Sequence, residues 1–303
     1  MRVIVCTASG RRSYRHLFGL LRSIHEKAVG HKPTVGVLNF DLTPEQKRCI
    51  EPLVDHVVEL GWDIRSTSKQ SDGGPPADPE NRAKTARPFL PEYFPGYDIY
   101  VWINAHAWIQ DIVALDCLVE ASAEGALAIV PEIDRAYRTQ YDHGRSRRWL
   151  HRHYNRFFDP TVAEKLWHMP VLNSGVFALH QKAPHWRIWA DEFQAAYLRQ
   201  PDSAAENATL NHIIFTYNLP CHFLPARFNW LINLALPKYC PEDRKFAEPM
   251  PPYTPLGIID LLDAPETAKY VLDCVGGRRK LRTMLEYDPI RAKPVRKWPG
   301  VLK

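Results

Sequence analysis

The stretch Tyr97-Asp98-Ile99-Tyr100-Val101-Trp102-Ile103-Asn104-Ala105-His106 decides the fold, because a run of β-branched and aromatic residues ends abruptly in polar ones. Such a run predicts a strand that is buried on both faces of a sheet. Strand alternation predicts that Asn104 and His106 share one face at the end of this strand. Polar groups placed there cost desolvation unless they find partners, which favours a ligand site over a simple capped strand end.

Strand-like and helix-like segments alternate on both sides of this stretch. Strands are predicted over 2–6, 33–40, 54–60, 126–130, 171–179, 221–224 and 257–260, and helices over 14–27, from 43, and over 81–89, 187–197 and 205–215. Residues 66–81 are rich in Ser, Gly, Pro and Asp and predict a loop. The alternation predicts an α/β domain with a central, mostly parallel mixed sheet flanked by helices.

Composition excludes several classes of protein. The chain has 303 residues, of which 45% are hydrophobic and 24% charged, as in an ordinary globular domain. No apolar run approaches the ~20 residues that span a bilayer. The six cysteines are scattered without a C-x-x-C pair, so neither a zinc knuckle nor a disulfide framework is predicted. Reduced thiols and a cytoplasmic location are therefore expected.

The net charge of +5 is unevenly distributed along the chain. Residues 276–303 carry nine Lys or Arg against Glu286 and Asp288, a net of +7, so residues 1–275 sum to −2. We therefore predict one domain over 1–275 and a basic C-terminal tail over 276–303. A near-neutral body disfavours nucleic-acid binding, which needs positive charge on a folded face.

Two further polar segments follow predicted strands. Thr7-Ala8-Ser9-Gly10-Arg11-Arg12 combines small residues with two cations, which suits a phosphate or a base at a strand end, although a plain turn is the alternative. It contains no G-x-G-x-x-G or P-loop pattern. Asn173-Ser174-Gly175 interrupts an apolar segment and predicts either close backbone approach to a ligand or a β-bulge.

Residues 145–158 interleave five arginines with Trp149, Tyr154, Phe157 and Phe158. Such a segment can bind an anionic or sugar acceptor by charge and stacking. The same pattern is also typical of an amphipathic helix whose basic side is solvated.

The order of these features resembles the retaining glycosyltransferases of the nucleotide-sugar GT-A fold, in particular family 8 of the bacterial type. The matching segments are the opening strand with Tyr14, the cations Arg82, Lys84 and Arg87 before Phe89-Leu90-Pro91, Leu172-Asn173-Ser174-Gly175-Val176-Phe177, Glu206-Asn207-Ala208-Thr209-Leu210-Asn211, Leu224-Pro225-Ala226-Arg227-Phe228-Asn229-Trp230 and Ile258-Ile259-Asp260. The family's D-x-D carboxylates are replaced by Asn104 and His106, its late metal-binding His by Asp260, and its Asp-Gln pair by Glu206-Asn207. The family's lysine would fall near Glu266, with Lys269 the nearest candidate.

The resemblance implies a hexosyltransferase that moves a sugar, with retention, from a nucleotide-sugar donor of the UDP type to a saccharide or glycoconjugate acceptor of a bacterial surface glycan. It implies three catalytic residues, Asn173, Glu206 and Asn207, of which Glu206 is alternatively a first-turn carboxylate that stabilises a helix. The residues implied for nucleotide-sugar binding are Thr7, Ala8, Ser9, Arg12, Tyr14, Lys84, Arg87, Asn104, Ala105, His106 and Lys269.

Two expectations about cofactor and membrane stay open at the level of sequence. His106 and Asp260 could hold Mn²⁺ or Mg²⁺ together with diphosphate oxygens, or arginines and lysines could stabilise the leaving group without a metal. The basic tail is expected either to contact the anionic inner face of a membrane or to be a solvated appendage.

Two other functions are compatible with the same residues. A catalytically inactive nucleotide- or glycan-binding protein would keep the fold after losing D-x-D. A nucleotidyltransferase is less consistent, because the opening turn lacks the Gly-rich, Lys-containing loop that binds a triphosphate.

Overall fold

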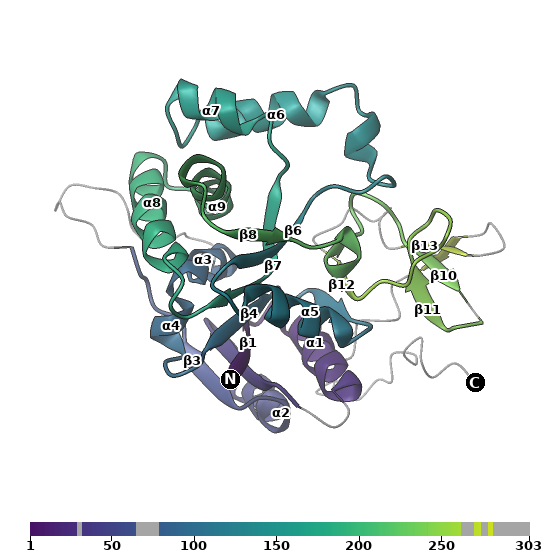
Figure 1. The fold of residues 1–303 in the computed structure, drawn as a ribbon. Helices are drawn as coiled ribbons and strands as arrows, with labels where there is room; N and C mark the ends of the chain where they lie inside the picture. The colour runs from purple at the N-terminus through teal and green to yellow at the C-terminus, as the bar shows by residue number, and fades with distance from the viewer. Residues whose placement is uncertain (29–31, 65–78, 241, 262–269, 274–277, 281–303) are drawn as a thin grey trace.

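The fold is that of a computed structural model, which describes residues 1–28, 32–64, 79–240, 242–261, 270–273 and 278–280. A seven-stranded sheet with the order β3-β2-β1-β4-β7-β6-β8 forms its centre (Figure 1). Its strands are β1 Val3–Ser9, β2 Thr34–Asn39, β3 His56–Glu59, β4 Ile99–Ile103, β6 Leu127–Pro131, β7 Leu172–His180 and β8 Cys221–Phe223. Only β7 runs antiparallel to its neighbours in this sheet, so the predicted mostly parallel mixed sheet is confirmed.

Helices cover both faces of the sheet. One face carries α1 Tyr14–Lys27, α2 Pro44–Ile50 and α5 Val113–Ser122, and the other carries α3 Pro79–Thr85, α4 Leu90–Tyr93, α8 His185–Arg199 and α9 Ala204–Tyr217. Two helices, α6 Arg145–Tyr154 and α7 Pro160–Leu166, lie beyond α9 (Figure 1). Short 3₁₀ helices occur at Glu51–Leu53, Arg87–Phe89, Arg138–Tyr141 and Ala226–Phe228.

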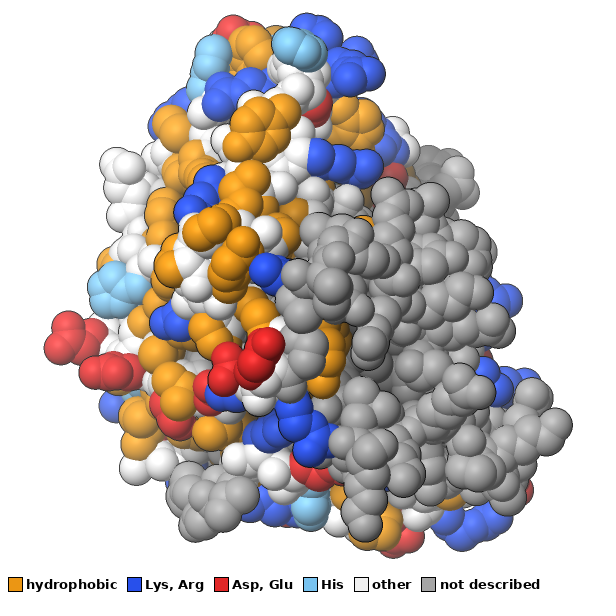
Figure 2. All heavy atoms as spheres, turned by 90° about the vertical axis from the view of Figure 1, so that its right-hand side faces the viewer, with side chains coloured by type: hydrophobic (Ala, Val, Ile, Leu, Met, Phe, Trp, Pro, Cys, Tyr) orange, Lys and Arg blue, Asp and Glu red, His pale blue; other side chains and the backbone are white. Residues whose placement is uncertain are grey.

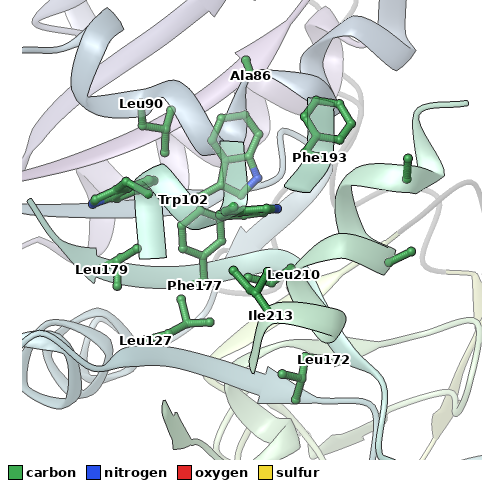
Figure 3. Packing of buried hydrophobic residues seen from close by; sticks show 14 of the residues in the cluster. Ala86, Leu90, Trp102, Leu127, Leu172, Phe177, Leu179, Phe193, Leu210 and Ile213 are labelled. Atoms are coloured by element: carbon green, nitrogen blue, oxygen red, sulfur yellow. The ribbon is translucent and has the colours of Figure 1, made fainter. Parts of the chain in front are cut away.

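The two faces of the sheet give two hydrophobic cores, as the apolar run of β4 requires. Val101 packs in the core with α1 and α5, whereas its neighbour Trp102 packs in the core with α8 and α9. In the second of these cores Trp102 and Phe177 lie between the sheet and Phe193 (Figure 3). Adjacent residues of β4 therefore point into opposite cores, and the strand is apolar throughout.

Two small sheets follow the central one, and the sequence patterns did not predict them as sheets. The first has the order β5-β12-β9, from β5 Ala107–Ile109, β12 Ile258–Asp260 and β9 Trp230–Leu231. The second has the order β11-β10-β13-β14, from β11 Lys245–Ala247, β10 Lys238–Cys240, β13 Tyr270–Asp273 and β14 Arg278–Lys280. The first small sheet matters for the site, because β12 pairs Asp260 with Ala107, just beyond the end of β4.

Some predicted boundaries differ from those in the structure. The helix predicted over 81–89 ends at Thr85, and Arg87–Phe89 forms a separate 3₁₀ turn. The predicted interruption at 173–175 is a bulge inside one continuous strand, where the pairing of β6 jumps from Phe177 to Asn173. Most of the predicted 66–81 loop and the boundary at 275/276 lie outside the described residues. Within the described residues, no helix is long and apolar enough to cross a membrane.

Two phenylalanines of the central sheet differ in burial, which predicts that they contribute unequally to the stability of the protein. Phe177 is 0% exposed, whereas Phe223 on the edge strand β8 is 49% exposed. We expect Phe177→Ala to lower the free energy of unfolding by about 3–5 kcal/mol, because it opens a cavity in the core. Phe223→Ala, the matched control, should cost at most about 1 kcal/mol. Urea unfolding followed by tryptophan fluorescence measures both, and equal losses would contradict the assignment of Phe177 to the core.

Candidate functional site

The site forms where the carboxyl ends of β1 and β4 meet. These strands are parallel neighbours, with Cys6 opposite Trp102, so Ser9 and Asn104 end at the same edge of the sheet. The bulge of β7 joins them, since the Asn104 backbone N–H donates to the Gly175 carbonyl at 2.8 Å. The first turn of α9 closes the group through Asn207, whose Oδ1 accepts from the Ser174 backbone N–H at 3.0 Å.

Arg87 is the centre of this group. Its guanidinium is 6% exposed and donates to Glu206 Oε2 at 2.5 Å, Ser174 Oγ at 2.8 Å and Asn104 Oδ1 at 2.8 Å. The Trp102 ring lies under it, with 5.2 Å between the guanidinium carbon and the ring centroid. One buried cation therefore connects the 3₁₀ turn after α3 with β4, β7 and α9.

Glu206 is the counter-charge of Arg87 and is 1% exposed. Burial raises the pKa of Glu206, and the Arg87 guanidinium acts in the opposite direction. Because an arginine stays protonated in a protein, the ionised pair is the state that leaves neither buried charge uncompensated. The carboxylate thus holds Arg87 and Ser174 in place inside the protein, and it is neither a solvated helix cap nor open to a substrate.

Asn104 connects Arg87 to the last residue of β12. Its Oδ1 accepts from Arg87 Nη2 and, at 3.0 Å, from Trp102 Nε1, while its Nδ2 lies 3.4 Å from Asp260 Oδ2. The opposite orientation of the amide would set N–H groups against two donors, so the network fixes Asn104. The carbonyl oxygen of Asn104 is fully used by protein donors and is not offered to a metal.

His106 is the partly exposed partner of the buried Asp260 in this network. His106 Nε2 lies 3.4 Å from Asp260 Oδ1, and the His106 side chain is 25% exposed, whereas Asp260 is buried. The prediction that Asn104 and His106 share one side is confirmed, since both contact Asp260. The cause is a turn, closed by the Ala107 N–H to the Asn104 carbonyl at 2.9 Å, and not strand alternation.

The geometry of His106 and Asp260 is compatible with a shared cation. Two ligand atoms held about 2.1 Å from one ion at tetrahedral or octahedral angles lie about 3.0–3.4 Å apart. The described residues contain no cluster of three or more His, Cys, Asp or Glu side chains that could hold a metal. The protein thus supplies two ligands, and phosphate oxygens or water would have to supply the rest.

The bulge of β7 presents Asn173 to three different elements. Its Oδ1 accepts from the Gly175 N–H at 2.9 Å and from Asn229 Nδ2 at 3.1 Å, and its Nδ2 donates to Glu132 Oε1 at 2.7 Å. Gly175 is required here because a Cβ at this position would lie 2.5 Å from Asn104 Nδ2 and 2.7 Å from Asn173 Oδ1. Two side-chain amides therefore pack directly on the backbone of this glycine.

Glu132 and Asn229 were missed as site residues in the sequence. Asn229 stands in the quoted 224–230 segment, and Glu132 follows the buried strand over 126–130 by two positions. The signal that identified Asn104, a polar residue directly after a buried strand, could also have identified Glu132. Desolvation and the nearby Asp260 carboxylate raise the pKa of Glu132, while its bond from Asn173 lowers it.

The remaining predicted binding residues are placed as follows. Thr7, Ala8 and Ser9 are buried at the end of β1, and Arg12 is exposed in the turn that follows. Lys84 is exposed on α3, close enough for its charge to lower the pKa of Glu206. Ala105 is buried between Asn104 and His106, and Lys269 lies outside the described residues.

Tyr14 is the predicted binding residue that the structure places least favourably for a ligand. It is 2% exposed in the core formed with α1 and α5. Its ring packs against Phe18, with centroids 6.1 Å apart. In this structure the ring is thus enclosed by the core and not open to a nucleotide base.

Comparison with known proteins supports the fold. No family model matches the chain, and no curated protein matches it in sequence. The galactosyltransferase LgtC, solved with donor and acceptor sugar analogues, matches with a TM-score of 0.52 and 12% identity over 85% of this chain and 86% of that chain. The apo form of mouse xyloside xylosyltransferase 1 matches with a TM-score of 0.52 and 12% identity over 87% of this chain and 98% of that chain.

A third solved structure is larger than this chain. The bifunctional glycosyltransferase WbbM, in its apo form, matches with a TM-score of 0.52 and 16% identity over 77% of this chain but 40% of its own. At such identities the likeness concerns the fold. The predicted GT-A-type α/β fold, shared with glycosyltransferases, is confirmed.

The ion pair between Arg87 and Glu206 predicts a large coupling energy. We expect Arg87→Met to lower the free energy of unfolding by about 3–5 kcal/mol, because it leaves Glu206 buried without a counter-charge. The double variant Arg87→Met/Glu206→Gln should lose clearly less than the sum of the single variants. Urea unfolding of the four proteins gives this coupling.

The control is an arginine whose ion pair is solvated. Arg48 pairs with Glu45 at 3.4 Å, with side chains 68% and 56% exposed, so Arg48→Met should cost under about 1 kcal/mol. Strictly additive losses at Arg87 and Glu206, or a loss at Arg87 no larger than at Arg48, would contradict a buried pair.

Proposed function

We propose that this protein is a glycosyltransferase that moves a sugar from a nucleotide-sugar donor, of the UDP type, to a saccharide or glycoconjugate acceptor with retention. The observation that carries the proposal is a connected polar network at the carboxyl ends of β1 and β4 in a fold shared with glycosyltransferases. The order of segments that resembles family 8 supports the donor type and the stereochemistry. An inactive binding protein of the same fold remains as the outcome in which donor binds without turnover.

The donor would bind over the end of β1 and the network beside it. Thr7, Ala8 and Ser9 are buried, so the donor would meet this end of β1 through the exposed turn that follows it. Gly10 is required at the start of this turn, because a Cβ there would overlap the side chains of Phe40 and Asp41. Arg12 and Lys84, both exposed, would supply positive charge to the diphosphate.

A divalent cation fits this arrangement as the partner of the diphosphate. His106 and Asp260 would hold Mn²⁺ or Mg²⁺ together with phosphate oxygens, and the ion would stabilise the negative charge that develops on the leaving group. Asp260 is the one carboxylate of this pair, so the ion should bind the free protein weakly and bind mainly with the nucleotide.

Transfer with retention requires only modest acid–base chemistry from the protein. The bond from the anomeric carbon to the phosphate oxygen breaks with its electron pair on UDP, and the acceptor oxygen bonds to the same face of that carbon. The acceptor proton moves to the leaving phosphate oxygen, so no strong enzyme base is needed.

Asn207 is the best placed of the three predicted catalytic residues to touch the sugar. Its Oδ1 is fixed by the Ser174 N–H, and its Nδ2 has no protein partner among the described residues. The side-chain amide of Asn173 is hydrogen-bonded to Gly175, Asn229 and Glu132, and Glu206 is buried in its pair with Arg87. We therefore assign Asn173 and Glu206 as positioning residues for the site.

Nucleotide binding tests the proposal directly. UDP and UDP-hexoses should raise the melting temperature more than ADP or GDP, since a ligand at 100 times its Kd adds about 2.7 kcal/mol to stability. Mn²⁺ should increase the UDP shift in the wild type but not in Asp260→Asn. The exposed surface variant His143→Asn is the control, and it should behave as the wild type.

Two outcomes of that panel would reject the proposal or narrow it. If no nucleotide diphosphate or nucleotide sugar shifts the melting temperature, a glycosyltransferase function is rejected. If UDP-hexose binds but releases no UDP with any saccharide acceptor, the binding-protein alternative is correct. If UDP is released with an acceptor, proton NMR of the product tests retention through the coupling constant of the anomeric proton.

The basic tail supports a peripheral membrane contact as part of this proposal. Each Lys or Arg near an anionic surface contributes about 1 kcal/mol, and residues 276–303 hold nine of them. We expect the protein to sediment with vesicles containing 30% phosphatidylserine at low salt. The variant Arg291→Gln/Lys293→Gln/Arg296→Gln/Lys297→Gln should stay in the supernatant while unfolding normally. Sedimentation that is unchanged in this variant would reject the contact.

A further inference from the structure

A large cavity lies beside the candidate site, and most of its lining comes from parts of the chain that the proposed donor site does not use. It has a volume of about 920 Å³, which is within the range of small-molecule pockets. Its walls come from the 3₁₀ helix at Arg138–Tyr141, from α6, and from residues 167–171 before β7. Glu132 and Asn207 line it as well, so the cavity opens onto the site.

Three of the residues lining the cavity are arginines, Arg138, Arg145 and Arg147, and all are exposed. None of them pairs with a carboxylate of the described chain, and the Arg145 Nε donates only to the Asp142 backbone carbonyl at 3.2 Å. Their charge is therefore available to a ligand.

The two carboxylates of the cavity wall are already engaged by protein donors. Asp142 accepts from the Ser146 N–H at 2.8 Å at the start of α6, and such bonds lower the pKa of Asp142. Glu132 accepts from Asn173. The three arginines outnumber these two carboxylates, so the lining of the cavity carries a net positive formal charge.

The rest of the cavity has the chemistry of a sugar site. Trp149 is 56% exposed and stacks on His153, with ring centroids 4.8 Å apart and planes 12° apart. Three polar atoms of lining residues are buried without a partner among the described residues, namely Thr139 Oγ1, Trp167 Nε1 and Asn233 Oδ1. An aromatic surface next to unsatisfied donors and acceptors matches the apolar face and the hydroxyl groups of a pyranose.

We infer that this cavity binds the acceptor and that the acceptor is a saccharide carrying an anionic group, a phosphate or a carboxylate. The inference rests on the proposed function, because it uses the shared residues Glu132 and Asn207 to place the acceptor next to the donor sugar. Figure 2 shows Lys and Arg side chains around hydrophobic ones at the top of the molecule, where Figure 1 places α6 and α7. The basic first turn of α6 borders a cavity that reaches the site. This position favours a binding role over the alternative of a basic face that is only solvated.

Helix α6 contains its own control for this inference. Arg145 and Arg147 line the cavity, whereas Arg148 and Arg152 are equally exposed on the same helix but do not line it. The variants Arg145→Gln/Arg147→Gln and Arg148→Gln/Arg152→Gln remove the same charge from the same helix. They separate a site in the cavity from a general effect of basic charge.

The experiment measures Kd by ligand-observed NMR for glucose 6-phosphate, glucuronate and methyl glucoside, each in the presence of saturating UDP. We expect one of the two charged sugars to bind at least about tenfold more tightly than methyl glucoside, which also distinguishes phosphate from carboxylate. That preference should be lost in Arg145→Gln/Arg147→Gln and kept in Arg148→Gln/Arg152→Gln. UDP should bind all three proteins equally.

Four results would overturn the inference. The first is equal binding of neutral and charged sugars, and the second is an equal loss of affinity in the two double variants. The third is that inorganic phosphate binds as tightly as glucose 6-phosphate. The fourth is that Arg145 and Arg147 retain anionic vesicles while no charged sugar binds. If instead UDP fails to bind while a charged sugar still does, the proposed function fails and the anionic sugar site stands.

Discussion

The ion pair between Arg87 and Glu206 is the constraint on which the arrangement of the site depends. Both groups are almost completely buried, so each requires the other as counter-charge. Arg87 comes from a 3₁₀ turn, Glu206 from α9, and the remaining acceptors from β4 and β7. Displacement of the 3₁₀ turn or of α9 would leave a charge without compensation inside the protein, and displacement of β4 or β7 would remove hydrogen bonds from Arg87.

The same pair explains why a neutral amide, and not a carboxylate, suits position 104. A third carboxylate, next to Glu206 and Asp260, would place three negative charges near the Arg87 cation. The neutral amide instead accepts from Arg87 and Trp102 with its oxygen and points its N–H groups toward Asp260. Asn104 therefore neutralises no charge but connects a buried cation to a buried anion.

Much of the fold and part of the site could be predicted from the sequence, because local patterns determine both. The apolar run of β4 and the polar residues after it fixed a buried strand and a candidate site at its end. Gly175 was identified as a place of close approach, which the amides of Asn104 and Asn173 now explain. The partner of Arg87 was not predictable, since Glu206 is 119 residues away and its first-turn position has an ordinary local explanation.

The small sheet β5-β12-β9 was missed for a related reason. Its strands are two or three residues long, so they carry no periodicity, and their pairing joins segments far apart in the chain. Tyr14, predicted as a binding residue, is buried in the core for a different reason. An aromatic residue after a small-residue turn is equally suited to a ligand and to a core, and the helical spacing of Leu17, Leu21 and Ile24 places Tyr14 on their buried side.

The site thus has a buried side, around Arg87 and Glu206, and a side that is open to solvent. Asn173 and Glu132 lie between the two. On the buried side Arg87 bonds to Glu206, Ser174 and Asn104, while Arg87 Nε and Glu206 Oε1 have no hydrogen-bond partner among the described residues. On the side open to solvent, His106, Asn207 and the arginines of the cavity have donors or charge that a ligand could use. Glu132 is hydrogen-bonded to Asn173 and also lines the cavity. A change in its charge on protonation would therefore alter the electrostatics of both sides. The buried side can therefore position other groups without taking part in a reaction. Ligand contacts and specificity would come from the side that is open to solvent.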